Sequence, residues 1–379
     1  MKIESLKEHL HRAISLAEHV TGKRLPLQIL SRVIIEARDN NLFIKATNLD
    51  LGIEIKVPAK IINTGKLAVQ GSLLENYLAN LGHQTTITLE TTQTNNNLLV
   101  TTGASSALIA CDKADDFPQL PELQGKIKDK NELPSTLAVE AQIFVSGLRA
   151  VAYAASLSDI KPELASVYVR VEDGDIILAT TDSFRLAEKR INSRKNNILP
   201  GLEDYLIPAK NVSEVIRVFG ETKSDIIVTY NKNQVSFQTN DIYLTSRLVE
   251  GSFPAYSQLI PKSFTTQAVM LKEDLASSIR LASVFSDKFH QVTMKIIPDD
   301  SLFELSARNQ EAGESTVRVD ATVEGEMIDI GLNARYLSDC FQYIQKDSVT
   351  LGFNGPGKAM LLRAVGDRTF TYLVMPLHK

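Results

Sequence analysis

Apolar residues recur every three to four positions in several stretches of the chain, which is the spacing of one buried face on a helix. One such stretch runs from Leu6 to Val20, and similar stretches run from Ala141 to Ala155 and from Leu271 to Phe285. In the first stretch the pattern predicts a buried stripe made of Leu6, Leu10, Ala13, Ile14 and Ala17. The residues expected to face solvent are Lys7, His11, Arg12 and Glu18.

A second set of helices is predicted over residues 72–81, 209–219 and 333–344, each directly after a short strand. Their apolar positions share one face, as expected for a helix that covers a sheet. The predicted buried face of the first of these helices consists of Leu73, Leu74, Tyr77, Leu78 and Leu81.

Other segments alternate apolar and polar residues, which is the period of a strand in an antiparallel sheet with one wet face. Examples are Ile53–Val57, Thr86–Glu90 and Val235–Thr239. Asparagine-rich stretches at 94–97 and 231–233 have the composition of turns between such strands. Helices that cover antiparallel sheets indicate the α+β class.

One pattern occurs three times, at intervals of about a third of the chain. A turn followed by a strand that ends in small and polar residues is found at Asn40–Asn48, Asp173–Asp182 and Asp300–Asn309. The two sets of helices recur in the same order around it. Because the interval is that of a whole domain, the pattern predicts a triplicated domain rather than a solenoid. The predicted domains are residues 1–128, 129–258 and 259–379.

Composition limits the class of protein. Apolar residues make up 44% of the chain and charged residues 23%, with a net charge of −4, as in an ordinary globular protein. No run approaches the roughly 18 apolar residues that cross a membrane, so no membrane association is expected. Charges interrupt the first eight residues, where a signal peptide needs an apolar core, so the predicted location is the cytoplasm.

The candidate chemical motifs are weak. Cys111 and Cys340 lack the spacing of a zinc site and are predicted to be reduced and partly buried. His9 and His11 point in different directions on a helix. Gly352–Lys358 has the glycines and lysine of a phosphate loop, but Ala359 replaces the hydroxyl that holds magnesium. It is interpreted as a hairpin turn, and no catalytic residue, metal site or cofactor is predicted.

Three segments, Thr180–Ala187, Leu248–Tyr256 and Tyr372–Leu377, resemble those of the bacterial DNA polymerase III beta subunits, the sliding-clamp family. The resemblance covers the whole chain. It implies three tandem DNA-clamp domains, each with two helices packed on antiparallel sheets, and a head-to-tail homodimer that forms a six-domain ring. It also implies a non-catalytic processivity subunit of the polymerase. By the same resemblance, the ring is expected to encircle double-stranded DNA independently of sequence and to keep the polymerase at high local concentration.

The resemblance further implies an apolar pocket between the second and third domains. In the family this pocket takes linear peptides from the polymerase III alpha subunit, the clamp loader and repair proteins. The matching positions are Leu164, Thr181, Arg185, Leu186, Pro254, Leu259, Tyr336, Val374, Met375, Pro376 and Leu377. The chain departs from the family at Ser183, where a glycine is usual, and at Gln258, where an arginine is frequent.

The same resemblance places helices and loops around the DNA, and basic residues are sparse on them. Sparse charges suit a weak, mobile and sequence-independent attraction to phosphates. The candidate DNA-facing residues are Lys7, Arg12, Lys23, Arg24, Arg149, Lys210, Arg217, Arg280 and Arg335. Arg24 matches a DNA-contacting loop arginine of the family.

Ring closure is expected between the strand around Ala107, Leu108 and Ile109 in one chain and the helix end at Ser283, Val284 and Phe285 in the other. Family members often carry a large aromatic residue where this chain has Ala107. The smaller side chain buries less apolar area at the contact.

Two other classes stay open on the sequence. A nucleotide-using enzyme would need the Gly352–Lys358 stretch to bind phosphate, so the absence of nucleotide binding would exclude it. A purely structural repeat scaffold would share the triplication but would not need the elements around Thr181, Arg185 and Met375. Peptide binding would separate these classes.

Overall fold

A computed structural model describes residues 1–22, 27–83, 85–92, 97–123, 135–192 and 204–377. The chain divides into two compact units. The described part of the first unit is residues 1–145 and 210–248, and that of the second is 146–192, 204–209 and 249–377, apart from the gaps just given. The predicted domain limit at 128/129 lies outside the described residues, and the limit at 258/259 falls within the short 3-10 helix Tyr256–Leu259. Both limits stay predictions.

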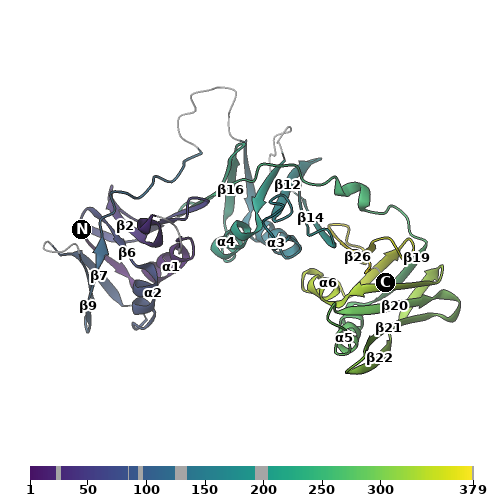
Figure 1. The fold of residues 1–379 in the computed structure, drawn as a ribbon. Coiled ribbons are helices and arrows are strands. Elements are labelled where there is room, and N and C mark those ends of the chain that lie inside the picture. The colour runs from purple at the N-terminus through teal and green to yellow at the C-terminus, as the bar shows by residue number, and fades with distance from the viewer. Residues whose placement is uncertain (23–26, 84, 93–96, 124–134, 193–203, 378–379) are drawn as a thin grey trace. The chain divides into compact units, whose positions relative to one another are not determined.

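Six α-helices occur in the described residues, and each follows a strand almost directly (Figure 1). The predicted positions of the helices are confirmed to within a few residues. The helices are α1 (Lys7–Glu18), α2 (Gly71–Ala79), α3 (Ala141–Ala152), α4 (Ala209–Phe219), α5 (Lys272–Ser283) and α6 (Ala334–Asp339). The sixth is shorter than predicted, because the chain continues from Phe341 to Tyr343 as a 3-10 helix.

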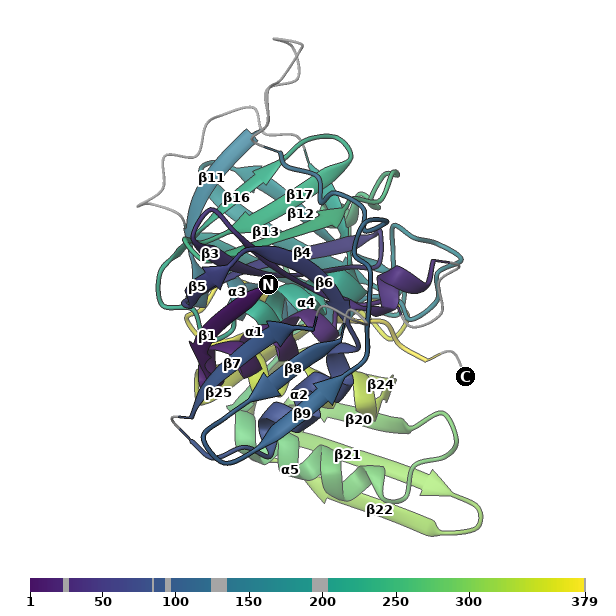
Figure 2. The ribbon, with the colours of Figure 1, turned by 90° about the vertical axis from the view of Figure 1, so that its left-hand side faces the viewer.

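In its described residues the first unit contains two antiparallel sheets, parts of which are labelled in Figure 2. The five-stranded sheet has the order β5 (Lys60–Asn63), β1 (Lys2–Leu6), β7 (Thr86–Thr91), β8 (Leu98–Thr101), β9 (Ser106–Ile109). The nine-stranded sheet has the order β10 (Cys111–Asp112), β6 (Gly65–Val69), β2 (Val33–Arg38), β3 (Asn41–Thr47), β4 (Leu51–Val57), β18 (Ile242–Arg247), β17 (Gln234–Gln238), β16 (Asp225–Tyr230), β11 (Ser135–Glu140). The β4–β18 pairing joins the first predicted domain to the second.

The second unit repeats this plan with another nine-stranded sheet and a four-stranded one. The larger sheet has the order β15 (Tyr205–Pro208), β12 (Ser166–Glu172), β13 (Asp175–Thr181), β14 (Arg185–Asn192), β27 (Phe370–Val374), β26 (Met360–Ala364), β25 (Ser348–Phe353), β19 (Thr266–Leu271), β23 (Ala321–Gly325). The smaller has the order β22 (Gly313–Arg318), β21 (Leu302–Asn309), β20 (Gln291–Ile297), β24 (Ile328–Asn333). The β14–β27 pairing corresponds to β4–β18, and the predicted α+β class with antiparallel sheets is confirmed.

The triplicated segment forms the same turn in all three copies. The side-chain oxygens of Asn48, Asp182 and Asn309 each accept hydrogen bonds from backbone N–H groups two and three residues further on. In two copies a threonine supports the turn, because the hydroxyls of Thr47 and Thr181 donate to the carbonyl four residues later, at 2.8 and 2.7 Å. The recurring sequence therefore encodes a recurring Asx turn.

Two details of the predicted helix faces are wrong. Leu6 is 42% exposed, whereas Lys7 is buried and its ammonium donates to the carbonyl of Leu81 at 3.0 Å. Leu6 ends β1, where the strand alternation that buries Ile3 and Ser5 turns it outward. Leu73 is 49% exposed, since only Gly71, Leu74 and Leu78 of α2 are buried.

The Gly352–Lys358 stretch connects β25 to β26, which pair antiparallel. The hairpin prediction is therefore confirmed. No helix begins at this loop, so it lacks the N-terminal dipole that a phosphate loop uses.

Candidate functional site

Arg185, the first residue of β14, lies at the centre of a group of polar and aromatic side chains in the second unit. Its guanidinium donates to the Asp182 carboxylate at 3.0 Å, to Asp339 on α6, and to the carbonyl of Tyr153 at 2.8 Å. The Arg185 side chain is only 11% exposed. Because a planar guanidinium has five donors in a fixed geometry, it holds three segments of the chain together here.

Aromatic rings complete this group. The Arg185 Cζ lies 4.6 Å from the ring centroid of Tyr336 and 5.5 Å from that of Tyr153, within cation–π range. Tyr153 stacks on Tyr343 with centroids 5.0 Å apart. The Tyr372 hydroxyl donates to the carbonyl of Tyr336 at 2.8 Å.

Burial and charge set the protonation of these groups. Burial works against the charged form of Arg185, but Tyr372 and the two carboxylates raise its pKa overall, so the guanidinium stays charged. Burial raises the pKa of Tyr153 well above its ordinary value. The Tyr153 hydroxyl is buried and has no hydrogen-bond partner among the described residues.

The turn before β14 links this group to the C-terminal segment. The N–H of Met375 donates to the carbonyl of Phe184 at 2.8 Å, and Val374 pairs with Arg185 across β14 and β27. The N–H of Leu377 donates to the carbonyl of Gly331 at 2.8 Å. The segment after β27 is thus fixed to both sheets of the second unit.

Two large apolar side chains are exposed where the turn before β14 meets the segment after β27. Phe184 is 59% exposed and Met375 is 39% exposed, whereas Pro376 is buried. Exposed large apolar side chains beside a buried charged group form a surface that can accept both apolar and polar atoms of a ligand.

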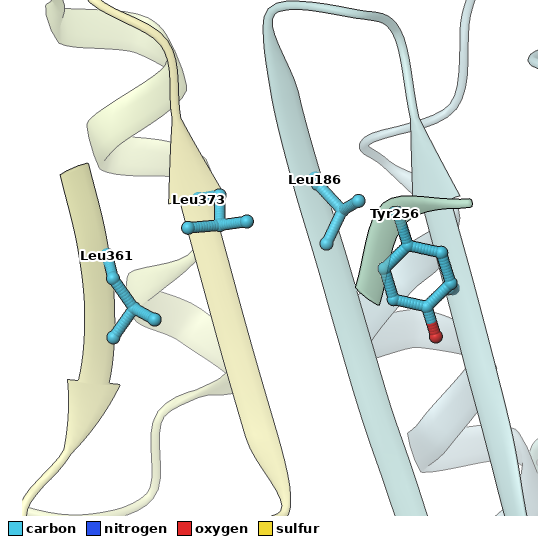
Figure 3. Close-up of a cluster of buried hydrophobic side chains, with 5 residues drawn as sticks. Leu186, Tyr256, Leu361 and Leu373 are labelled. Atoms are coloured by element: carbon cyan, nitrogen blue, oxygen red, sulfur yellow. The ribbon is translucent and has the colours of Figure 1, made fainter. Parts of the chain in front are cut away.

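The structure brings together five of the predicted pocket residues, Thr181, Arg185, Tyr336, Val374 and Met375. Leu186 lies next in β14 and packs with Tyr256, Leu361 and Leu373 in a buried cluster (Figure 3). Leu164 is 7% exposed, and Pro254 and Leu259 are exposed on the connector between β18 and β19. The hydrogen bonds and ring contacts that hold the Arg185 group together involve none of these last three residues.

Five residues of the group were not among the predicted pocket residues: Tyr153, Asp182, Asp339, Tyr343 and Tyr372. Tyr153 and Asp339 carry no local signal, because each depends on partners far away in the chain. Asp182 did carry a local signal, because it lies in a recurring turn shortly before a strand, which is typical of an Asx turn.

Ser183 adopts φ +78°, in the left-handed region that favours glycine. We expect Ser183→Gly to relieve this strain and to raise the free energy of unfolding by a few tenths up to about 1 kcal/mol. Thermal denaturation measures the change, with Ser286→Gly as a control because that serine is not among the positive-φ residues. If Ser183→Gly lowers the free energy of unfolding by as much as Ser286→Gly does, the turn is not strained.

The predicted DNA-facing residues differ in how far they are free to contact a phosphate. Arg149 on α3, Arg280 on α5 and Arg335 on α6 are exposed, as is Arg12 on α1. The side chain of Lys210 is 66% exposed and lies 3.6 Å from the Asp50 carboxylate. Lys23 and Arg24 lie outside the described residues.

Two more of the candidate cations have internal partners. Arg217 donates to Glu214 at 2.7 Å and to the carbonyl of Leu16 at 2.7 Å. The prediction that Lys7 faces DNA is wrong, because this side chain is buried against Leu81.

The predicted ring-closing residues lie on an edge strand of the first unit and at a helix end of the second. Ala107, Leu108 and Ile109 belong to β9, an edge strand, and Leu108 is 59% exposed while Ile109 is buried. Ser283 ends α5, and Val284 after it is 71% exposed. The ring of Phe285 lies against Gly313, at the start of the edge strand β22.

Other chemistry is limited. Cys111 and Cys340 are free thiols, and burial raises the pKa of Cys111 to about 11, so this thiol stays protonated near neutral pH. Within the described residues no group of three His, Cys, Asp or Glu side chains could hold a metal ion. In the same residues no helix is long and apolar enough to cross a membrane.

Comparison with known proteins gives consistent matches along the chain. Profiles of the DNA polymerase III beta subunit match in three consecutive parts, with the N-terminal domain at residues 1–121, the central domain at 138–255 and the C-terminal domain at 257–378. The chain is 27% identical over 383 residues to the beta sliding clamp of Synechococcus elongatus, covering 100% of this chain and 99% of that one. It is 27% identical over 365 residues to the beta sliding clamp of Staphylococcus epidermidis, covering 93% of each.

Solved structures share the fold. The sliding clamp of Bacillus subtilis superposes with a TM-score of 0.91 at 21% identity, covering 100% of this chain and 99% of that one. The clamp of Pseudomonas aeruginosa bound to griselimycin superposes with a TM-score of 0.90 at 21% identity, covering 100% of both chains. Since the three profiles together span most of the sequence, the chain belongs to the DNA polymerase III beta subunit family, the sliding clamps.

Proposed function

We propose that two copies of this chain close head-to-tail into a ring around duplex DNA, and that the ring tethers the replicative polymerase in the cytoplasm. Membership of the clamp family assigns the chain to DNA replication as a processivity factor. A closed ring is retained by topology, so its partner rebinds before it diffuses away. The chain itself carries no catalysis in this proposal.

The observation that carries the ring is the pair of open sheet edges. In the described residues β9 ends one sheet of the first unit and β22 ends one sheet of the second. An edge strand presents unpaired backbone groups that can pair with another chain. Pairing β9 of each copy with β22 of the other would give two equivalent junctions and a closed assembly. Leu108, Val284 and Phe285 would supply apolar contacts at each junction.

The exposed arginines on α3, α5 and α6 support a weak electrostatic contact with DNA. The net charge of −4 argues against tight phosphate binding by the chain as a whole. A few mobile contacts would hold the ring centred on the duplex without stopping it from sliding.

We also propose that the Arg185 group, with the exposed side chains of Phe184 and Met375, binds linear peptides of the polymerase III alpha subunit, the clamp loader and repair proteins. A P. aeruginosa clamp was solved bound to griselimycin, so a protein of this fold takes a ligand. Met375 suits varied peptides, because its unbranched side chain can adopt several shapes. Leu164, Leu186, Pro254 and Leu259 remain proposed walls of this pocket.

The test of the ring is retention on nicked circular DNA after loading by a clamp loader, measured before and after the circle is linearised. The proposal expects retention on the circle and release from the linear form. Equal retention on both forms would mean direct DNA binding and would overturn the topological mechanism. Peptide binding measured separately, without DNA, distinguishes failure of the pocket from failure of the ring.

Removal of the exposed arginines should change the salt dependence of DNA binding. For the triple variant Arg149→Ala, Arg280→Ala and Arg335→Ala, we expect the slope of log K against log salt to fall by about 0.9 for each arginine that contacts a phosphate. Fluorescence anisotropy on short duplexes measures this slope. The control variant replaces three exposed cations that lie in loops between secondary-structure elements, Lys232, Lys358 and Arg368, with alanine. This variant should leave the slope unchanged. Equal slopes in both triple variants would contradict the DNA-facing assignment.

A further inference from the structure

A cavity of about 760 Å³ lies within the first unit, between the nine-stranded sheet and the connector formed by residues 117–122. This volume is within the range of small-ligand sites. The Tyr243 hydroxyl fixes the connector, because it donates to the carbonyl of Pro121 at 2.7 Å and accepts from the N–H of Leu123 at 3.3 Å. The cavity is separate from the Arg185 group, which belongs to the second unit.

The second unit has the corresponding place, and there it is filled. In the first unit Lys45, two residues before Thr47, pairs with Glu54 across β3 and β4. In the second unit Ala179, two residues before Thr181, pairs with Glu188 across β13 and β14. The two pairs therefore hold equivalent positions in the repeat.

In the second unit an aromatic side chain from the connector occupies this place. Tyr256 packs with Ala179, Leu186 and Leu373, as Figure 3 shows for its labelled members, and its hydroxyl donates to Glu188 at 2.6 Å. The first unit has a charged lysine where the second has Ala179, and the cavity beside it is lined by Phe117 and Leu120 of the connector.

The floor of the cavity carries one cation and two carboxylates, so these three side chains by themselves have a net charge of −1. The Lys45 ammonium lies 2.8 Å from both Glu36 and Glu54, and all three side chains are less than one-third exposed. Burial opposes the ionised form of Glu36, but its hydrogen bond with Lys45 and the nearby cations lower its pKa overall. The charge of Lys45 is thus shared between two carboxylates and is not available to a ligand.

Two further cations of the lining are more exposed. The Arg38 side chain is 46% exposed, lies 3.7 Å from Glu54 and has its guanidinium 4.8 Å from the ring centroid of Phe43. Lys66 is exposed, with its ammonium 5.9 Å from the ring centroid of Phe117. The other anion of the lining, Glu122, is exposed on the connector.

Sheet register places these two cations close together. Lys66 pairs with Glu36 across β6 and β2, and Arg38 follows Glu36 by two residues on the same face. Diagonal neighbours of this kind are about 7–8 Å apart in the backbone. Long side chains at that separation can reach a single anionic group, and a guanidinium binds carboxylate or phosphate through two parallel hydrogen bonds.

We infer that the cavity binds a ligand that carries a carboxylate or phosphate beside a planar or apolar group. The anion lies between Arg38 and Lys66, and the planar or apolar group lies against Phe117 and Pro118 of the connector. The same chemistry is found in a free nucleotide and in an acidic side chain next to an aromatic one in a peptide. The site is independent of the proposed ring and of the Arg185 group.

The test is isothermal titration of the full chain with three probes: inorganic phosphate, ATP and the peptide acetyl-Glu-Phe-amide. The proposal expects ATP or the peptide to bind with a Kd of about 1 mM or tighter and more tightly than phosphate. Tighter binding of ATP identifies a free anion as the ligand type, and tighter binding of the peptide identifies a partner segment. Arg38→Glu and Lys66→Glu should each weaken that binding at least tenfold.

The matched control is Lys232→Glu, which makes the same charge change at an exposed turn of the same unit, outside the lining. It should leave binding unchanged. Thermal unfolding of each variant checks that the exposed substitutions leave the fold intact. No binding of any probe to the unaltered chain, or equal loss in the control, would overturn the inference.

Discussion

Arg185→Ala is expected to lower the free energy of unfolding of the second unit by about 2–3 kcal/mol. The substitution removes the shared partner of Asp182, Asp339 and the Tyr153 carbonyl, and it leaves both carboxylates without this cation. The upper end of the usual range for broken buried pairs does not apply, because the Asp339 side chain is 44% exposed and water can reach it. Urea denaturation followed by circular dichroism measures the loss.

Arg185→Ala should also weaken peptide binding. Since Arg185 holds the turn that fixes Met375 through the Phe184 carbonyl, its loss should reduce the affinity of a clamp-binding peptide at least tenfold. Arg185→Lys keeps the charge but not the planar set of donors, so it should recover only a minor part of both effects.

The matched control is Arg190→Ala, on the same strand. Arg190 also contacts two carboxylates, Glu172 at 3.1 Å and Asp175 at 3.5 Å, but its side chain is 34% exposed. An exposed pair of this kind contributes at most about 1 kcal/mol, and peptide affinity should not change. Equal effects of the two alanine variants would contradict the special role of Arg185.

Gly325→Ala is expected to destabilise the second unit strongly, although it adds only one methyl group. A Cβ at this position would lie 1.9 Å from the backbone oxygen of Thr265 and 2.8 Å from the Cα of Thr266. The backbone φ of +102° is also unfavourable for alanine. Because both contacts are with backbone at the start of β19, which pairs with β23, neither can move away as a flexible side chain would.

We expect a loss of more than about 3 kcal/mol, which corresponds to a decrease in Tm of roughly 6–12 °C for a unit of this size. Gly355→Ala is the matched control, since Gly355 has a similar φ of +106° but no atom within 4 Å of the position that a Cβ would occupy. It should cost only the strain of the left-handed backbone, about 1 kcal/mol. A similar decrease in both variants would mean that strain, not the close approach to Thr265, dominates at Gly325.

The candidate site was only partly predictable. Thr181, Arg185, Tyr336, Val374 and Met375 were named from the family resemblance, and they do come together. Tyr153 and Asp339 could not be named, because their role exists only where α3, α6 and β14 meet around one guanidinium. The cavity of the first unit was equally hidden, since it depends on which side chain the connector places over Lys45.

The local structure and its repetition could be read from the order of the amino acids alone. Helix and strand periods, and the Asx turns at Asn48, Asp182 and Asn309, depend on residues within a few positions of each other, so they can be recognised without a fold. The α+β class and the three copies followed from these patterns. Other features could not be read in this way: β4 pairs with β18 and β14 with β27, Lys7 is buried while Leu6 is exposed, and Arg185 has two carboxylate partners. The reason is that pairing and burial depend on residues far apart in the chain, whose proximity no local period encodes.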